Sequence, residues 1–418
     1  MTRILIRSPK SPFEAVSPER VLSRNLIGDN SGNLLFLESA WRLLSTRGTE
    51  ITADRFAPHS FDPDEVSERF DVYVIPLANA FRIAFEAQLI RYTRLIERLK
   101  IPVVVVGVGF QGGIPYQSGA TRPMDGTVKA FVGAVLDRSP SIGVRGEYTQ
   151  DYLQRLGFRD VEVIGCPSMF LYGDRLSVTK RTPTLARDAR IGIGVTNKIT
   201  AMGPIVASHV ERYPNLEYIA QDIDALRLLL WGEGPAGDAA SSPLPIHRSH
   251  PLLRDDKSVF FVDPWPWLER MREIDFMFGT RIHGSIAAAL AGTPSFLLAA
   301  DARTLELARY FEIPHRVMSD VPPDVDAADL YDEADLSGLV GGHAARARTF
   351  FGYLERHGLG HIFQEGEDAS AFDERLAAVT FPEPVRVRRV DRILRTRRGA
   401  ARLARRIRST ARQHLRPA

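Results

Sequence analysis

The chain has 418 residues, of which 44% are hydrophobic, and a single cysteine, Cys166. This length favours two domains over one core, and one cysteine excludes an internal disulfide, which is typical of a reducing cytosol. The net charge of +3 hides an asymmetry, because residues 381–418 hold 13 arginines and two acids while the rest of the chain is acidic. No apolar run is long enough for a signal sequence or a transmembrane helix, so we expect a cytoplasmic protein.

Short apolar runs alternate with longer amphipathic runs, which predicts βα units and parallel sheets. Strands are expected at residues 3–6, 72–75, 103–108, 141–144, 161–164, 190–195, 217–220, 258–262, 276–278 and 295–298. Helices are expected at residues 31–45, 81–100, 147–156 and 285–291. The segment 231–256 is rich in Gly, Pro and Ser and is interpreted as a long surface loop, either a lid or a variable insertion.

A polar segment with a proline, residues 174–188, separates two series of strands and marks a domain boundary. We therefore predict an α/β fold with two domains that face a cleft, a common location for substrates. The N-terminal domain is placed at residues 1–178, the C-terminal domain at 186–375 and a basic tail at 381–418.

The segment after the strand at 276–278 carries the strongest functional signal. A Gly-Thr turn follows the strand, and a helix of small residues begins near Gly284 and Ser285. Arg281 and His283 therefore lie at a helix N-terminus, where free N–H groups and the helix dipole attract anions. Arg281 can bind a carboxylate or phosphate in a fork, and His283 titrates near neutrality. The alternative is that Arg281 pairs with an acid and His283 is structural.

This segment resembles the Arg-x-His-Gly signature of the polysaccharide pyruvyltransferase family. Four further segments resemble family elements in the family's order: Asn25–Asn30, Val106–Gly113, Val144–Thr149 and Val163–Ser168. The likeness covers roughly residues 1 to 320, and five pieces in order are more specific than any one alone. Gly146 and Cys166 stand where the family commonly has aspartate, and Arg303 stands where many members have lysine.

The resemblance implies two Rossmann-like domains in a GT-B-like arrangement and a bacterial transferase. Family members move a carboxyethylidene group from phosphoenolpyruvate to a pair of sugar hydroxyls, leaving a pyruvate ketal in a surface polysaccharide. The implied acceptor is a sugar or a lipid-linked oligosaccharide. No cofactor and no metal is implied, because phosphoenolpyruvate is the donor substrate.

The resemblance also assigns residues to roles. Arg145, Arg281 and Arg303 match the roughly three negative charges of phosphoenolpyruvate, and His283 is expected as the acid or the phosphate partner. Asp29 is expected to activate the hydroxyl. The alternative base is Glu147, and the remaining expected substrate-binding residues are Asn30, Gln111, Gly284 and Ser285. The run from Gly107 to Gly113 lacks the spacing of a dinucleotide fingerprint, and a tight turn without a ligand explains it equally well.

Two rival functions remain open from the sequence: a nucleotide-sugar glycosyltransferase of the same architecture, and a non-catalytic family member that binds glycan. The tail also has two interpretations. Residues 387–415 can be drawn as an amphipathic basic helix on an anionic membrane, at the inner membrane face, or as a solvated basic tail. Specific nucleic-acid binding is not expected, because the body is acidic and no recognition module is visible.

Overall fold

The first parallel sheet forms the framework of the N-terminal half. The computed structural model describes residues 1–114, 116, 122–234 and 242–387. Its first sheet has the order β2-β1-β3-β4, made of β1 (Thr2–Ile6), β2 (Thr49–Ala53), β3 (Val72–Pro76) and β4 (Val103–Val106). β5 (Ile142–Val144) and β6 (Val161–Val163) continue it, because Val108 pairs in parallel with Val144. The strand order reverses between β1 and β3, which makes this edge a topological switch point.

The second parallel sheet has the order β12-β11-β10-β7-β8-β9. Its strands are β7 (Ile191–Gly194), β8 (Leu216–Ala220), β9 (Ser258–Phe260), β10 (Phe276–Gly279), β11 (Ser295–Ala299) and β12 (His315–Val317). Counted from β7, this is the Rossmann order 3-2-1-4-5-6, with its switch point between β7 and β10. The two Rossmann-like domains in a GT-B-like arrangement are thereby confirmed.

Each predicted strand is present, whereas β2 and β12 were not predicted from the sequence. Both are edge strands with only partly buried or exposed residues, so neither carries the apolar run that identifies the inner strands. The predicted helix at 81–100 is shorter, because a 3₁₀ turn at Ile83–Phe85 precedes it. The helix predicted at 285–291 begins earlier, at Ile282.

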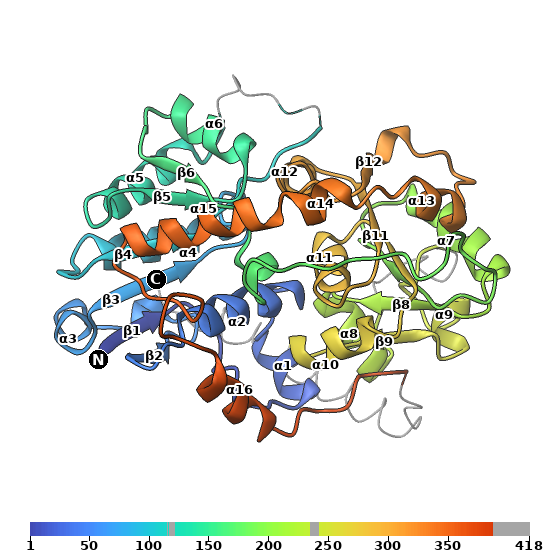
Figure 1. Cartoon of the computed structure of the whole chain (residues 1–418), viewed down its shortest axis with the longest axis horizontal. Helices are drawn as coiled ribbons and strands as arrows, with labels where there is room; N and C mark the ends of the chain where they lie inside the picture. The colour runs from blue at the N-terminus through green and yellow to red at the C-terminus, as the bar shows by residue number, and fades with distance from the viewer. Residues whose placement is uncertain (115, 117–121, 235–241, 388–418) are drawn as a thin grey trace, which may run out of the picture.

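Helices cover both sheets (Figure 1). In the first half these are α1 (Pro18–Arg24), α2 (Gly32–Leu44), α3 (Pro63–Arg69), α4 (Glu86–Ile96), α5 (Asp125–Leu136) and α6 (Glu147–Arg155). In the second half they are α7 (Met202–Arg212), α8 (Ile223–Trp231), α9 (Pro251–Arg254), α10 (Pro264–Met271), α11 (Ile282–Leu290), α12 (Ala302–Phe311), α13 (Ala327–Glu333), α14 (Ser337–Gly341), α15 (His343–Arg356) and α16 (Ser370–Ala377). Within the described ranges, none of these helices has the length and apolar character needed to cross a membrane.

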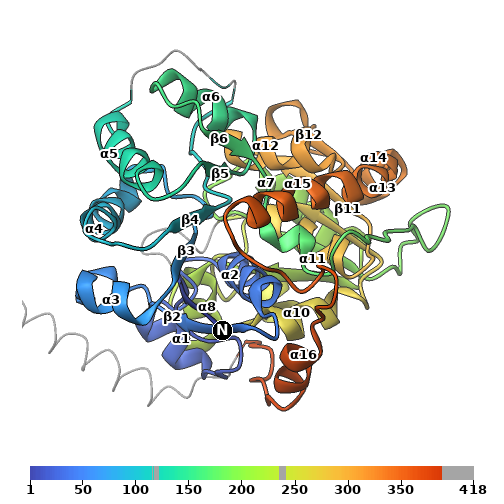
Figure 2. The ribbon, with the colours of Figure 1, turned by 60° about the vertical axis from the view of Figure 1, so that its left-hand side comes forward.

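Helix α2 lies between the two domains and is buried on nearly all sides, in contact with α10 and α11 (Figures 1 and 2). Its buried acid Glu38 has partners from elsewhere in the fold. Glu38 accepts a hydrogen bond of 2.7 Å from the Trp265 indole and pairs with Lys10 at 3.2 Å. Lys10 also binds Asp263 of the second domain at 2.5 Å, so a buried charge cluster joins the two domains.

The chain after α14 returns to the first domain. The Tyr353 hydroxyl on α15 donates to the Val105 carbonyl at 2.7 Å and accepts from the Gly143 amide at 3.0 Å. Helix α15 therefore packs on the first sheet, although its residues lie in the range that the sequence assigns to the second domain. Figure 1 shows it, in orange, across the left-hand domain.

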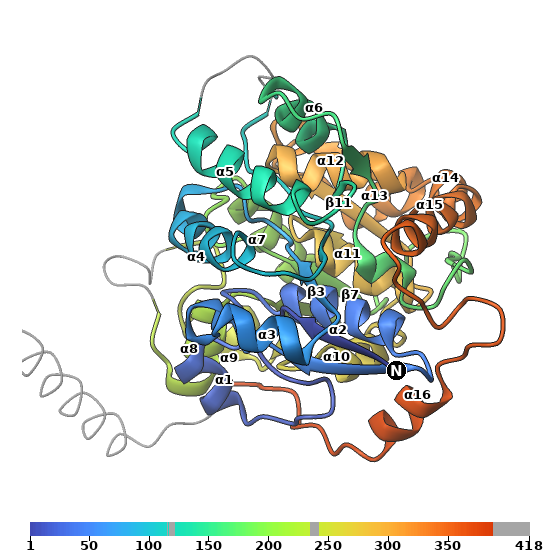
Figure 3. The same cartoon turned by 90° about the vertical axis from the view of Figure 1, so that its left-hand side faces the viewer.

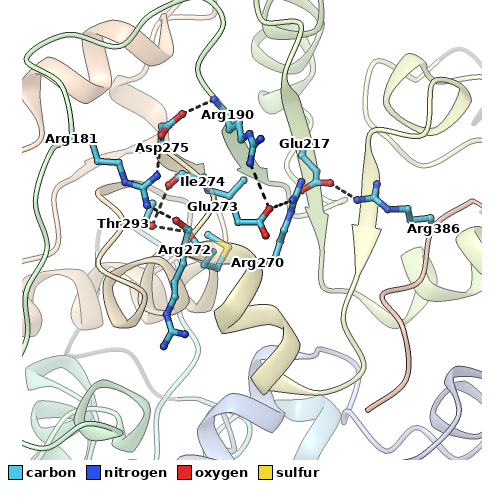
Figure 4. A network of polar contacts seen from close by, with 11 residues as sticks. Arg181, Arg190, Glu217, Arg270, Arg272, Glu273, Ile274, Asp275, Thr293 and Arg386 are labelled. Carbon is cyan, nitrogen blue, oxygen red and sulfur yellow. Dashed lines mark hydrogen bonds and ion pairs between the residues drawn. The ribbon is translucent and has the colours of Figure 1, made fainter. Parts of the chain in front are cut away.

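The segment after α16 lies along the edge strand β9 of the second sheet. Val385 pairs antiparallel with Phe260, and the Arg386 guanidinium donates to Glu217 on β8 at 2.9 Å (Figure 4). Arg270 of α10 donates to the same carboxylate at 2.8 Å. Residues 388–418 lie outside the described residues, so the predicted membrane role of the basic tail stays a prediction.

Candidate active site

Arg281 sits where the carboxyl end of the second sheet meets the first domain. It follows β10 and forms the N-cap of α11, beside the switch point between β7 and β10. Its Nε donates to the Val195 carbonyl at 3.3 Å, and its Nη2 forms an ion pair with Asp222. Asn30 of the first domain donates to the same carboxylate at 3.3 Å. Arg281 therefore pairs with an acid, as the alternative interpretation of the sequence expected, and it lies at the N-terminus of α11 as predicted.

His283 is packed against the start of α2. A Cβ atom on Gly32 would lie 2.7 Å from the imidazole, so only glycine leaves room for the ring there. Burial, together with the positive fields of Arg145, Arg303 and Arg281, lowers the pKa of His283 to about 3. The imidazole is therefore neutral at pH 7 in the free protein, and it can act as an acid only after something changes its surroundings.

Arg145 follows β5 and is almost fully buried, with 3% of its surface exposed. A Cβ atom on Gly109 would lie 1.9 Å from its Nε, so the glycine-rich strand end gives this arginine its space. Within the described part of the chain, the buried Nε has no hydrogen-bond partner. Burial lowers the pKa of Arg145 to about 10, which leaves the side chain charged at neutral pH. Arg145 is therefore a buried cation whose Nε is not satisfied by the described residues, and such a cation is suited to an incoming anion.

Glu306 is a site residue that the sequence reasoning missed. It projects from α12, is 3% exposed and lies 3.9 Å from the Arg145 Nε. Its carboxylate accepts hydrogen bonds of 3.0 Å from both the amide and the hydroxyl of Thr149 on α6. Burial raises the pKa of Glu306 to about 7. Figure 3 shows α6 and α12 side by side, which brings this acid into the first domain.

The position of Glu306 explains one departure from the family pattern. A Cβ atom on Gly146 would lie 3.1 Å from the Glu306 side chain. The chain has no carboxylate at residue 146, where the family commonly has one. The carboxylate of Glu306, from α12, fills the adjoining space. The only sequence signal was an acid between the apolar residues Leu305 and Leu307 in a segment whose helical character had not been recognised.

Arg303 and Asn30 join the cluster from opposite domains. Arg303 begins α12, its Nη2 lies 3.3 Å from Asp301, and among the described residues its buried Nε has no partner. The neighbouring Ala302 amide donates to the Gly112 carbonyl at 3.0 Å, which fixes the start of α12 against the glycine-rich strand end. The structure therefore brings together Arg145, Arg281, His283, Arg303 and Asn30.

The other predicted site residues differ in their placement. Asp29 is exposed, and its Oδ1 accepts a hydrogen bond of 2.8 Å from Asn25 at the wall of a separate pocket. Gln111 is exposed and accepts from Asn79 at 3.2 Å. Glu147 is exposed at the start of α6. Gly284 and Ser285 are buried inside α11.

Two other polar groups lie at this centre. Gln221 follows β8 and is 2% exposed, and both polar atoms of its amide are without a hydrogen bond to any described residue. The Cys166 thiol is 3.9 Å from the His283 Nε2, a proximity that the sequence did not indicate. No three His, Cys, Asp or Glu side chains are grouped for a metal ion in the part of the chain that the structure describes.

Fold and site together define a two-domain α/β protein with three arginines and a neutral histidine where the carboxyl ends of two parallel sheets meet. Such a centre is suited to a small anion with several charges. The model of the polysaccharide pyruvyl transferase family matches residues 30–301. The chain belongs to this family, and Asn30, Arg145, Arg281 and His283 all lie within the matched range.

Solved structures similar to this chain share little sequence with it. A Rickettsia bellii UDP-N-acetylglucosamine 2-epimerase is 10% identical with a TM-score of 0.45, covering 86% of this chain and 96% of its own. The S. aureus MnaA–UDP structure is 11% identical with a TM-score of 0.43, covering 88% and 100%. A Methanocaldococcus jannaschii UDP-GlcNAc 2-epimerase in complex with UDP-GlcNAc and UDP is 10% identical with a TM-score of 0.42, covering 83% and 97%. No curated protein matches the chain.

Proposed function

We propose that this protein transfers a carboxyethylidene group from phosphoenolpyruvate to two hydroxyls of one sugar, forming a pyruvate ketal. The observation that carries the proposal is the convergence of Arg145, Arg281 and Arg303 around His283. Phosphoenolpyruvate has a carboxylate and a phosphate close together, and three buried or partly buried arginines offset its charges. Arg145 and Arg303 each have a buried Nε without a partner among the described residues, so the protein itself does not satisfy either guanidinium fully.

The reaction is balanced as follows. A proton adds to the methylene carbon of phosphoenolpyruvate, and positive charge develops at C2. One sugar hydroxyl forms a C–O bond to C2, the C2–O bond to phosphate breaks, and a second hydroxyl closes the ketal. Of the two protons that the hydroxyls lose, one balances the new methyl group and the other leaves on inorganic phosphate. No oxidant or reductant is needed.

Each side chain has a role in this scheme. The arginines bind the donor and stabilise the charge on the departing phosphate. Burial is the main cause of the low pKa of His283, and the positive fields of the arginines lower it further. A bound phosphate offsets those fields and can form a hydrogen bond with the imidazole, which favours a proton on His283. Glu306, whose pKa is about 7, holds Arg145 in place as a positioning residue.

Calorimetric titration of phosphoenolpyruvate tests the donor assignment. Wild type is expected to bind, whereas Arg281→Ala is expected to lose at least roughly tenfold in affinity, because one charge-assisted contact is removed. Arg272→Ala is the matched control. Arg272 is a half-exposed arginine just after α10 that pairs with Glu269. Figure 4 labels it in a polar network that contains none of Arg145, Arg281 and Arg303, so this variant should bind like wild type.

The same titration separates the rival functions. Binding of UDP-glucose but not of phosphoenolpyruvate would contradict the proposal and favour a nucleotide-sugar transferase. Binding of phosphoenolpyruvate without release of phosphate, across a panel of sugar acceptors, would favour a non-catalytic glycan-binding role. Release of phosphate that requires both a sugar and His283 would support the proposed reaction.

A further inference from the structure

A polar cavity lies inside the first domain. It is next to the donor centre, the cluster of Arg145, Arg281, Arg303 and His283 that we propose binds phosphoenolpyruvate. The cavity is about 340 Å³ in volume and opens at the carboxyl ends of β1 and β3, where the order of the first sheet reverses. Ligands of open α/β sheets bind at this kind of switch point. Its wall includes Arg7, Asp29, Phe56, Asn79, Arg82 and Gln88. Its size suits a monosaccharide unit.

Four buried polar atoms on the wall of this cavity lack a partner among the described residues. They are the Nε atoms of Arg7 and Arg82, the Oδ1 of Asn79 and the Oε1 of Gln88. A buried polar atom without a hydrogen bond costs about 1–3 kcal/mol, so native folds seldom keep one without a reason. Four such atoms around one cavity, from the end of β1, the connection after β3 and the helix α4, indicate a polar ligand with several hydrogen-bonding groups.

The chemistry of the wall selects the kind of ligand. The Arg7 guanidinium lies 4.3 Å from the centre of the Phe56 ring, and its Nη1 donates to the Pro76 carbonyl at 3.1 Å, so its orientation is fixed. The buried Nε of Arg82 has no hydrogen-bond partner among the described residues, and Asp29 supplies an opposite charge that acts on this guanidinium. Three arginines, Arg7, Arg24 and Arg82, thus line the cavity with one carboxylate, that of Asp29, and amide groups are available for hydroxyls.

The cavity and the donor centre share a wall. Asp29 lines the cavity, and the next residue, Asn30, hydrogen-bonds to Asp222, which pairs with Arg281. On the other side, Asn79 of the cavity donates to Gln111, in the glycine-rich strand end that also contacts α12. A ligand in the cavity is therefore adjacent to the donor without occupying the arginine cluster.

We propose that this cavity binds the acceptor, and that the acceptor is a sugar carrying an anionic group, either a carboxylate or a phosphate. Arg7 and Arg82 bind the anionic group, while Asp29 and Asn79 bind hydroxyls. The role of this sugar as the acceptor rests on the proposed function. The predicted binding of an anionic sugar can be measured without turnover.

The test is ligand-detected NMR and calorimetry on the full chain in the presence of phosphoenolpyruvate, with three probes: D-glucuronate, glucose 1-phosphate and glucose. At least one anionic probe is expected to bind roughly tenfold more tightly than glucose, as one charge-assisted contact allows. Arg82→Gln is expected to remove this preference, and Arg82→Lys to retain part of it. Arg94→Gln, an exposed arginine on α4, is the matched control and should behave like wild type.

The outcomes separate this inference from the proposed function. A preference for glucuronate points to a uronic acid acceptor, and a preference for glucose 1-phosphate points to a phosphorylated sugar. Equal binding of all three probes, no binding at all, displacement of the anionic probe by phosphoenolpyruvate, or an unchanged preference in Arg82→Gln would overturn the inference. Failure of phosphoenolpyruvate to bind wild type would instead count against the proposed function.

Discussion

The donor centre and the first-domain cavity are both arginine-containing sites at the carboxyl ends of parallel strands, but they are built differently. The donor centre is closed by contact between the domains, with Arg145 at 3% exposure and the His283 ring against α2. The cavity is contained within one domain and remains open, with a volume of about 340 Å³.

This difference shows what the domain contact contributes. In the cavity, Arg7 is oriented by its own domain, through an aromatic ring and a backbone carbonyl. In the donor centre, Arg145 from the first domain meets Glu306 from the second, and Arg281 from the second meets Asn30 of the first through Asp222. The donor centre exists only when both domains are in place, whereas the cavity does not depend on their contact.

Removing Arg145, the buried cation of the donor centre, should have the largest effect on activity. It should leave binding in the first-domain cavity unchanged. Arg145→Met is expected to lower kcat/KM for phosphoenolpyruvate by about 10³-fold, because a preorganised charge in a site shielded from water is lost. Phosphate release measures this. Anionic sugar binding in the cavity should persist. Arg155→Met, on the neighbouring α6 and paired with Asp125, is the control and should keep activity. Loss of sugar binding in Arg145→Met would show that the two sites are not separate.

A second variant tests whether Glu306 replaces the carboxylate that the family commonly places at residue 146. Gly146→Asp alone puts two carboxylates in one buried site and should destabilise the fold by about 3–5 kcal/mol, the usual cost of an uncompensated buried charge. Adding Glu306→Ala should recover most of that stability, as measured by urea unfolding. Equal destabilisation in the single and the double variant would mean that the two carboxylates do not share one site.

The pKa of Glu306 predicts how stability depends on pH. Its pKa is raised from 4.5 to about 7 in the folded protein, so the folded state holds a proton that the unfolded state releases between these values. Stability from this group is therefore complete below pH 4.5 and is lost as the pH rises through 7. Wild type should lose about 2–3 kcal/mol more than Glu306→Gln between pH 4.5 and 7.5 in urea titrations. Parallel pH profiles would contradict this assignment.

The smallest expected effect comes from the contact that closes the donor centre. Gly32→Ala places a methyl group 2.7 Å from the His283 ring and should cost about 1–3 kcal/mol of stability and reduce turnover. Gly126→Ala, near the start of α5 with nothing within 4 Å of the added Cβ, is the control and should change neither. Sugar binding in the cavity should again be unaffected. An active Gly32→Ala variant of wild-type stability would show that the His283 ring has room to move.

Much of the framework could be predicted from the sequence because it is local. The apolar runs of the inner strands identified them, and the spacing after Phe278 placed Arg281 and His283 at the start of α11. The edge strands β2 and β12 were missed because their polar residues carry no apolar pattern. Asp29 and Glu147 were chosen as bases from their place in the family segments, yet both are exposed in the structure.

The sequence by itself determined the two α/β domains, the family and the position of the Arg-x-His-Gly turn, since periodicity and short spacing encode these features. Only the tertiary structure decided that Asp222 holds Arg281, that Glu306 fills the space beside Gly146, and that burial among arginines keeps His283 neutral. These facts depend on how two separately patterned domains pack against each other, and no spacing along one chain records which side chains meet across that contact.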